Sequence, residues 1–351
     1  MAPAGTLENE THSLWNLKTS GMDRDVFLER LRKAVTRHLG PGHRIDNASR
    51  LTGGAASTTW RFDVPGGAME QTLILRLSQG GAQISTGLSK RTEAEVLRVA
   101  VANGVPAPTI AFILDEQDDL GEGFAMEFIS GASIPRKILR DEQFADARSR
   151  MARQCGRILA DIHRSDAASV TDLPVLDALT QLEQYESMYR GYGERIPPFE
   201  LAMRWLERRL PKRPAAVLVH GDFRNGNFLV TAEDGLRAIL DWELAHIGDA
   251  MEDLGWLCVN SWRFGNRDKP VGGFGQRRDL FNAYEEASGH AVDEEVVRFW
   301  EVFGTLRWGI MCLYLSFEHL IGSERSVERA AIGRRVSETE IDLLQLMQNK
   351  G

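Results

Sequence analysis

The 351 residues of the chain exceed what one compact core usually holds, so two domains or lobes are expected. A net charge of −8, from 42 Lys and Arg against 50 Asp and Glu, argues against nucleic acid as the main partner, since such proteins normally carry a basic face. Three widely spaced cysteines support neither a zinc site nor a disulfide framework, and the most apolar stretch is too short to cross a membrane. We therefore expect a cytoplasmic protein without a membrane partner.

The N-terminal third predicts a small lobe made mostly of strands. Residues 1–22 show no periodic pattern and are predicted to form a flexible leader. Downstream, the apolar spacing changes from a helical period to alternation and back, with Gly and Pro at the breaks. The predicted elements are a helix over 25–39, a hairpin over 58–64 and 72–77, a helix over 90–102, and strands over 109–114 and 123–128. Together they define an N-terminal lobe of residues 23–128.

From residue 129 onward the pattern becomes mainly helical. Helical periodicity alternates with Pro-rich joints, and one short strand-like region interrupts it. The predicted helices cover 146–164, 199–210, 293–317 and 336–349, and the predicted strands cover 216–219, 227–230 and 236–240. We therefore expect a larger helical lobe of residues 129–351 that holds a β-ribbon, with a ligand bound in a cleft between the two lobes.

The most informative segment is 219–227, which reads VHGDFRNGN, followed by ILDWE at 239–243. It places a carboxylate at Asp222, an amide at Asn227 and a second carboxylate at Asp241, each flanked by apolar residues. Phosphoryl transfer needs this set, because a base must accept the proton of the acceptor hydroxyl and oxygen ligands must hold Mg²⁺ against the phosphates. A capped turn is the alternative interpretation of Asp222 and Asn227, but it leaves the spacing to Asp241 unexplained.

This segment resembles the signature of the aminoglycoside phosphotransferase and choline kinase superfamily, H-G-D-x-x-x-x-N followed by a hydrophobic run that ends in D-W-E. It is nearest to the branch called the phosphotransferase family, which is related to kinase domains fused to acyl-CoA dehydrogenases. The resemblance implies an α+β, two-lobed protein-kinase-like fold, with a small antiparallel-sheet N-lobe and a larger, mainly helical C-lobe. It also implies phosphate transfer from ATP to a hydroxyl of a small molecule, with Mg²⁺.

By the same resemblance, Asp222 is the expected catalytic base, and Asn227 and Asp241 are the expected magnesium ligands. Glu243 and Arg224 are candidate contacts to the acceptor or outer contacts to the metal. For Glu243, a role at the surface is the alternative.

Three further residues of this region are interpreted as structural. His220 is expected to brace the catalytic loop, with a metal-binding or general-base role as the alternative. Asp249 and Glu252 fit a capping box that opens a helix. Asp253 resembles the buried acid by which the family ties that helix to the catalytic loop.

A phosphate-binding loop is expected in the N-terminal lobe. The segment 51–59, LTGGAASTT, lies between two strand-like stretches, where Gly53, Gly54, Ser57 and Thr58 can bring backbone N–H groups to a nucleotide phosphate. An ordinary hairpin turn is the alternative interpretation.

The remaining nucleotide contacts are expected on two strands and a helix. Where the resemblance calls for a lysine, this chain has Arg76. Side chains alternate along a strand, so Arg76 is expected on the face opposite its leucine neighbours. Its expected partner on the following helix is Glu93, with Glu95 as the competitor. Backbone groups of Glu127 and Ile129 are expected to recognise the purine, which leaves both ATP and GTP open as donors.

The acceptor is expected to carry an acidic or acyl group. Arg224 lies next to the expected base, the loop 262–264 is basic and aromatic, and the tail 325–335 is rich in arginine. These cations would repel a polycationic acceptor, whereas an anion would be attracted. Pairing of the arginines with local acids is the alternative interpretation.

Three other classes of function are alternatives: a protein kinase, which is not favoured, and a pseudokinase and a phosphoesterase, which both stay open. A protein kinase is not favoured, because Gly221 replaces the arginine of its H-R-D motif and no Ser, Thr or Tyr lies between Asp241 and Trp256. A nucleotide-binding pseudokinase is favoured by Arg76 and disfavoured by the complete acidic and amide set. A two-metal phosphoesterase would use the group His220, Asp222, His246 and Asp249.

Overall fold

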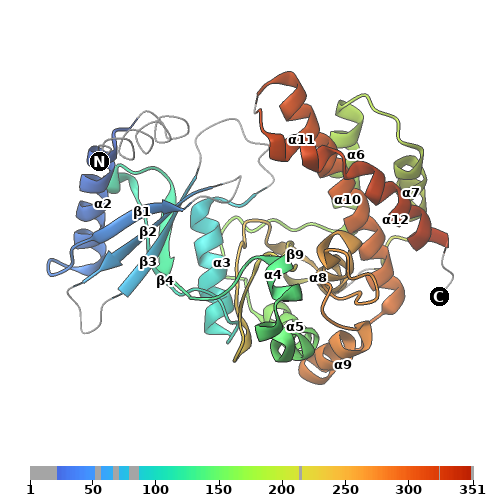
Figure 1. The fold of residues 1–351 in the computed structure, drawn as a ribbon, viewed down its shortest axis with the longest axis horizontal. Helices are drawn as coiled ribbons and strands as arrows, with labels where there is room; N and C mark the ends of the chain where they lie inside the picture. Colours follow the sequence, from blue (N-terminus) through green and yellow to red (C-terminus); the bar gives the residue numbers. More distant parts are fainter. Residues whose placement is uncertain are drawn as a thin grey trace, which may run out of the picture. The chain divides into compact units, whose positions relative to one another are not determined.

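The computed structural model describes residues 22–51, 57–65, 71–78, 87–212, 216–323 and 325–348. The chain divides into two compact units (Figure 1). One contains the residues up to Arg98 together with Pro108–Ile129, and the other contains Val99–Ala107 and the residues from Ser130 onward. The predicted leader lies outside the described residues, except for Met22.

The first unit is a five-stranded antiparallel sheet covered by a helix. The strands are β1 (Asp46–Leu51), β2 (Ser57–Val64), β3 (Gln71–Ser78), β4 (Ile110–Ile113) and β5 (Gly123–Glu127), in the order β1-β2-β3-β5-β4. Helix α2 (Arg24–Leu39) begins at Asp23, which accepts a hydrogen bond from the backbone N–H of Asp25. Its apolar side packs on the sheet, where the ring centroids of Phe27 and Trp60 are 4.7 Å apart. The predicted first helix and hairpin are confirmed.

Helix α3 (Lys90–Ala102) has the bounds that the sequence predicts, and it begins in the first unit and ends in the second. The second unit is mainly helical, as predicted. Its helices are α4 (Pro135–Arg140), α5 (Ala145–Arg164), α6 (Ala178–Gly191), α7 (Pro197–Glu207), α8 (Ala250–Cys258), α9 (Arg277–Ser288), α10 (Glu294–Ile321), α11 (Val327–Gly333) and α12 (Val336–Gln348).

The core of the second unit is built around α10, a helix of 28 residues that packs against α8, α11 and α12 (Figure 1). Its buried face contributes Trp300 and Phe303, and α7 contributes Phe199 to the same apolar cluster. A helix that is apolar on most sides is expected to be buried, which explains its central place.

Two short antiparallel ribbons frame the segment that carries the motif. β6 (Ala216–Val219) pairs with β9 (His246–Asp249), and β7 (Phe228–Thr231) pairs with β8 (Gly235–Ile239). The sequence predicts three of these strands as one region but misses β9. The motif loop thus connects β6 of one ribbon to β7 of the other.

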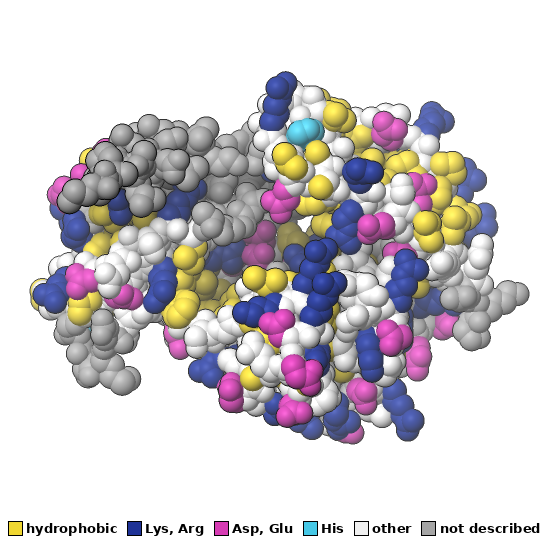
Figure 2. All heavy atoms as spheres, in the orientation of Figure 1, with side chains coloured by type: hydrophobic (Ala, Val, Ile, Leu, Met, Phe, Trp, Pro, Cys, Tyr) yellow, Lys and Arg dark blue, Asp and Glu magenta, His cyan; other side chains and the backbone are white. Residues whose placement is uncertain are grey.

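Among the described residues, no helix is long and apolar enough to span a membrane. On the face of the helical unit that Figure 2 shows, acidic and basic side chains are interspersed.

Candidate active site

The loop of residues 220–227 is shaped by one glycine. Gly221 has a φ of 77°, and a Cβ at this position would lie 2.3 Å from the carbonyl oxygen of Leu244. Any side chain would therefore clash with backbone, in addition to the strain of a left-handed conformation. This explains why the motif has glycine where a protein kinase has arginine.

The carboxylate of Asp222 is oriented by three donors. Its Oδ1 accepts from Nε of Arg224 at 2.9 Å and from the indole Nε1 of Trp256 at 2.8 Å. Its Oδ2 accepts from Nδ2 of Asn227 at 2.6 Å. The same Nδ2 lies 3.0 Å from the backbone carbonyl oxygen of Asp222. The side chain is 13% exposed, so it is held in place yet open to a reacting group.

Asp253, a residue of helix α8, holds the backbone of the loop through hydrogen bonds. It is fully buried and accepts hydrogen bonds from the backbone N–H groups of His220 at 2.8 Å and Gly221 at 3.0 Å. Nε2 of His163 lies 3.2 Å from the same carboxylate. Burial alone would raise the pKa of Asp253, but the hydrogen bond and charge of His163, with the backbone donors, hold that pKa below its ordinary value.

His220 links Asp222 to the strand that precedes Asp241. Its Nδ1 accepts from the backbone N–H of Asp222 at 3.1 Å, and its Nε2 lies 3.1 Å from the carbonyl oxygen of Leu240. These two contacts require the neutral imidazole with the proton on Nε2. Burial lowers the pKa of His220, against the raising effect of Asp253, Asp222 and Asp241. The ring is therefore occupied in bracing the loop.

The neutral state of His220 predicts a dependence of stability on pH. Its folded pKa lies below the ordinary value of 6.5, so the unfolded chain binds this proton first as the pH falls. Stability from this group is therefore complete above about pH 6.5 and declines below it, by at most about 1.4 kcal/mol per pH unit. Urea unfolding of wild type and His220→Gln between pH 5 and 8 measures the difference. A wild-type curve parallel to that of the variant would contradict this account.

The two expected metal ligands, Asn227 and Asp241, lie on backbone segments that are hydrogen-bonded to each other. The backbone N–H of Leu240 donates to the carbonyl oxygen of Asn227 at 2.8 Å, which brings Asp241 next to the end of the motif loop. Because Nδ2 of Asn227 faces Asp222, its Oδ1 is the atom left for a cation. Asp241 has a φ of 68°, a rare conformation that is often found at functional sites. Carboxylate and amide oxygens fit the preference of Mg²⁺. Glu243 is half-buried two residues later.

An aromatic and cationic cluster adjoins Asp222. The rings of Trp256, Trp262 and Trp308 follow one another at centroid distances of 5.1 and 4.9 Å. The guanidinium of Arg224 lies 4.5 Å from the ring of Trp262, and that of Arg335 lies 5.7 Å from the ring of Trp308. The indole N–H groups of Trp262 and Trp308 are buried without a hydrogen-bond acceptor among the described residues. Two cations therefore lie against a row of three indole rings that begins at the one bonded to Asp222.

Two other arginines of this region have structural partners. Arg263, in the loop that the sequence associates with the acceptor, pairs with buried Glu301 at 2.9 Å, as Arg277 does at 2.6 Å. The buried guanidinium of Arg307 donates to the carbonyl oxygen of Gly221 at 3.1 Å and lies 4.5 Å from the ring of Trp256. Arg307, which was not predicted from the sequence, therefore supports the backbone of the loop at Gly221.

On the sheet unit, Arg76 lies on the face that the alternation predicts. Its guanidinium pairs with Oε1 of Glu93 at 3.1 Å and donates to Oγ of Ser57 at 3.1 Å. The ammonium of Lys90 lies 2.6 Å from the other oxygen of Glu93. Glu95 is half-buried on the same helix. The sequence analysis missed Lys90, although the i, i+3 spacing to Glu93 was a usable signal.

The other expected nucleotide contacts are only partly placed. Gly53 and Gly54 lie outside the described residues. Thr58 is buried in β2, and the backbone N–H of Glu127 is engaged with the carbonyl oxygen of Thr109 at 2.9 Å. Ile129 is the last residue of the sheet unit.

The predicted capping box at α8 is half right. Asp249 caps the helix by accepting from the backbone N–H of Met251 at 3.0 Å. Glu252 instead turns into the core, where it accepts from Gln181 at 2.7 Å and lies 3.1 Å from Nε2 of His246. Because His246 is engaged by Glu252 and by the carbonyl oxygen of Leu244, the geometry does not favour the two-metal phosphoesterase.

Among the described residues, one group with metal-like spacing lies in the sheet unit, at His38, Asp115 and Asp118. The guanidinium of Arg37 pairs with Asp115 at 2.7 Å and with Asp118 at 2.6 Å. Since a cation of the protein already occupies this group, we interpret it as an ion-pair cluster that ties α2 to the turn before β5.

Residues 47–290 of the chain match the model of the phosphotransferase enzyme family. A Ralstonia eutropha protein named as a candidate aminoglycoside phosphotransferase aligns over 91% of this chain and 98% of its own, with a TM-score of 0.72 and 20% identity. Spectinomycin phosphotransferase, solved with ADP and spectinomycin, aligns over 92% and 98%, with a TM-score of 0.61 and 13% identity. At these identities the structures show the kinase-like fold, which was predicted.

The curated relatives are longer proteins. Mouse acyl-CoA dehydrogenase family member 10 is 26% identical over 54% of this chain and 18% of its own length. Human acyl-CoA dehydrogenase family member 11 is 25% identical over 65% of this chain and 29% of its own length. The chain thus spans less than a third of the length of these relatives.

Proposed function

Because the chain belongs to the phosphotransferase enzyme family, we propose that it transfers the γ-phosphate of ATP, or of GTP, to a hydroxyl of a small molecule. The observation that carries this proposal is the carboxylate of Asp222, which Arg224, Trp256 and Asn227 hold in place while it stays partly exposed. A base for phosphoryl transfer needs a fixed direction more than a strong proton affinity, because positioning contributes much of the catalysis.

In this mechanism Asp222 accepts the proton of the acceptor hydroxyl as the hydroxyl oxygen bonds to the γ-phosphorus, while the bond from that phosphorus to the β–γ bridging oxygen breaks and the nucleoside diphosphate leaves. The donors on its two oxygens fix the plane of the carboxylate, and His220 with Asp253 fixes the backbone that carries it. Arg224 lies beside the same carboxylate, where its charge would face the oxygens of the transferred group or an anionic part of the acceptor.

Asn227 and Asp241 would hold Mg²⁺ through Oδ1 and the carboxylate, with Glu243 as an outer contact. Bound there, the ion would neutralise the charge that develops on the phosphates. This role follows from the donor set and from the connection of the two residues through Leu240.

Arg76 would contact the nucleotide phosphates, with Glu93 setting its direction. The buried carboxylate of Glu93 is shared by Arg76 and Lys90, which fixes the positions of both cations on the sheet unit. Arg is a good bidentate ligand for phosphate, so the replacement of lysine is compatible with binding but changes the geometry. Gly53, Gly54, Ser57 and Thr58 would contribute to the phosphate-binding loop, and the backbone of Glu127 and Ile129 would contact the purine.

A nucleotide-binding module without transfer is the second candidate. The observation that favours it is Arg76 in place of lysine. The complete arrangement of Asp222, Asn227 and Asp241 argues for transfer.

We further propose that the acceptor carries an anionic group, a carboxylate in the simplest case. The cluster of three tryptophans beside Asp222 carries the guanidinium groups of Arg224 and Arg335. Arg224 pairs with Asp222 and Arg335 pairs with Glu338 at 3.1 Å, and each guanidinium has further N–H donors. Tryptophan faces bind organic cations when they are free, but here guanidinium groups of the protein already lie against them. Oxygen acceptors with negative charge match what remains.

The acceptor proposal predicts a selective effect of Arg335. With ATP and Mg²⁺, hydroxy acids should be phosphorylated in preference to amino alcohols of the same length. Arg335→Gln should raise the KM for the hydroxy acid about tenfold, the cost of one lost charge-assisted contact. Arg334→Gln is the matched control, because the exposed Arg334 is the adjacent residue. Turnover of amines with none of hydroxy acids, measured by mass spectrometry, would overturn this proposal.

A further inference from the structure

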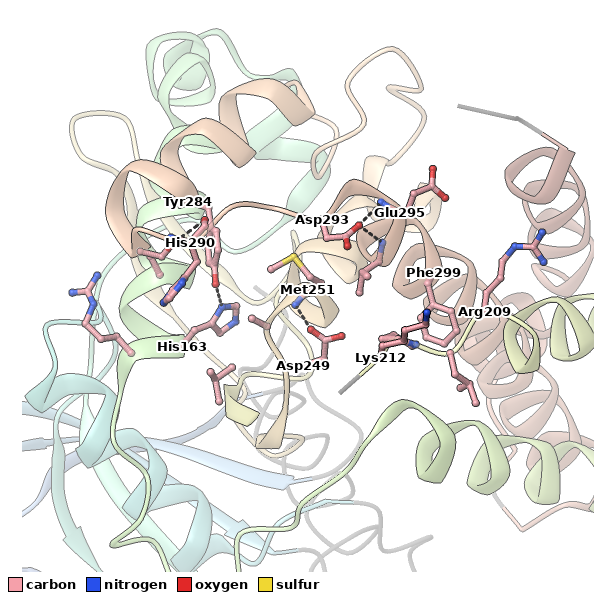
Figure 3. A pocket seen from close by; sticks show the side chains of 18 of the residues that line it. His163, Arg209, Lys212, Asp249, Met251, Tyr284, His290, Asp293, Glu295 and Phe299 are labelled. Atoms are coloured by element: carbon pink, nitrogen blue, oxygen red, sulfur yellow. Dashed lines mark hydrogen bonds between the residues drawn. The ribbon is translucent and has the colours of Figure 1, made fainter. Parts of the chain in front are cut away.

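The helical unit contains a pocket of about 760 Å³ that takes no part in the function proposed above. It lies between the C-terminal ends of α5, α7 and α9 and the N-terminal ends of α8 and α10 (Figure 3). None of the residues proposed for catalysis or for nucleotide binding lines it. Its volume is within the range that holds a small organic ligand.

The inner wall of this pocket offers hydrogen-bond acceptors. Figure 3 shows the hydroxyl of Tyr284 directed at Nδ1 of His163, at 3.0 Å. Nε2 of His163 faces Asp253 and its Nδ1 faces the hydroxyl of Tyr284, whose oxygen keeps at least one lone pair for a ligand whichever of the two groups donates. Burial raises the pKa of Tyr284 to about 12, so the hydroxyl stays protonated.

Asp249 adds a buried negative charge to the same wall. Its two oxygens accept from the indole Nε1 of Trp300 at 2.8 Å and the backbone N–H of Met251 at 3.0 Å. Each carboxylate oxygen can accept a further hydrogen bond. Burial raises the pKa of Asp249 above its ordinary value, so a bound cation would relieve an unfavourable charge.

The opposite side of the pocket offers cations. Lys212 and Arg209 lie on the side of Phe299, away from His163 and Tyr284 (Figure 3). Arg209 is engaged with the ring of Trp205 at 4.5 Å. Neither Arg208 nor Lys212 makes an ion pair with any residue that the structure describes. These two exposed charges are available to an anion.

We propose that this pocket binds a small zwitterion, with its ammonium group toward Asp249 and Tyr284 and its carboxylate or phosphate toward Lys212 and Arg208. The apolar part of the ligand lies against Met251, which projects between the two charged sides (Figure 3). Asp293 and Glu295 also line the pocket, and Asp293 accepts from the backbone N–H groups of Glu295 and Val296. The lining thus holds both acids and exposed cations, and a ligand with one charge alone would leave one of the two kinds unmatched.

The bound zwitterion also contacts groups that support the catalytic loop. Tyr284 bonds to His163, which bonds to Asp253, and Asp253 holds the backbone N–H groups of His220 and Gly221. Asp249 caps the helix that carries Asp253. Ordering of these groups by the ligand should therefore slow local opening of the loop.

Calorimetric titration of the whole protein tests the site without reference to activity. The probes are 4-aminobutanoate, 6-aminohexanoate and 8-aminooctanoate, compared with hexanoate and hexylamine. We expect at least one amino acid to bind about tenfold more tightly than either singly charged analogue. Equal binding of the analogues, or no binding of any of the amino acids, would overturn the proposal.

Three variants locate the ligand. Met251→Trp should abolish binding by filling the pocket, and a normal melting curve must show that it folds. Arg208→Gln should weaken binding about tenfold, whereas Arg204→Gln, one turn earlier on α7, should leave it unchanged. Binding that persists in Met251→Trp would place the ligand elsewhere and overturn the assignment.

Hydrogen exchange tests the connection to the loop. Saturating ligand should lower the exchange rate of the peptide over 218–224 in wild type. In Met251→Trp the same addition should leave that rate unchanged. An exchange rate that the ligand leaves unchanged in wild type would contradict the connection.

Discussion

Replacement of Asp253 by alanine is expected to lower the free energy of unfolding by about 3–5 kcal/mol, the usual cost of removing one partner from a buried charged network. The variant leaves the backbone N–H groups of His220 and Gly221 and the imidazole of His163 without their acceptor. All of these groups are buried, so water cannot replace the carboxylate at little cost. Urea unfolding at neutral pH measures the change.

A second acidic helix residue provides the control for this experiment. Asp177 caps α6 by accepting from the backbone N–H of Thr180 at 2.8 Å, in an exposed position. Asp177→Ala should cost about 0.5–2 kcal/mol, as removal of an N-cap usually does. If Asp253→Ala costs no more than this control, the proposed fastening of the loop is wrong. Because Asp253 holds the loop of Asp222, the variant should also lose phosphotransfer in whatever fraction remains folded.

Replacement of Asp222 by asparagine is expected to lower kcat by about 10²–10⁴-fold, which is the range for loss of a general base. The oxygen of the new amide can still accept from Arg224 and Trp256, whereas its NH2 group faces Nδ2 of Asn227, which loses that acceptor and keeps the backbone carbonyl of residue 222. The free energy of unfolding should therefore fall by no more than about 1–2 kcal/mol. The KM for ATP should change little, since the substitution leaves the sheet unit intact.

Measuring kcat and the free energy of unfolding together shows whether Asp222 acts as the base or only supports the structure of the loop. Asp234→Asn, in the exposed turn between β7 and β8, is the matched control and should leave both kcat and stability unchanged. A variant Asp222→Asn that is stable and retains turnover within about tenfold of wild type would show that this carboxylate is not the base.

Much of the fold can be predicted from the sequence because its periodic elements are long. Helix α3 and strand β6 have the predicted bounds, and α5, α7, α10 and α12 were recognised, whereas the amphipathic helix α9 was missed. Helix α6 was missed because its buried positions include Gln181 while Leu179 is 45% exposed, which blurs the pattern. Strand β9 was missed because it has four residues, of which His246 and Asp249 are polar and buried.

The candidate site was predictable to the extent that it is local in sequence. Asp222 and Asn227 lie in one loop, and the motif names them without any knowledge of packing. The supports of that loop come from far along the chain. Trp256 and Arg307 reach it from α8 and α10, through contacts that only the packing of helices creates. No spacing in the sequence announces such contacts.

The central claim is transfer of a nucleotide γ-phosphate by Asp222, and one experiment tests it most directly. Wild type and Asp222→Asn are each incubated with a metabolite extract, Mg²⁺ and ATP carrying an isotope label on the γ-phosphate, and labelled products are identified by mass spectrometry. We predict labelled phosphoesters of hydroxyl compounds with wild type that are absent with the variant. Nucleotide binding by both proteins, seen as a rise in melting temperature, with no labelled product from wild type would contradict the claim and support the binding module instead.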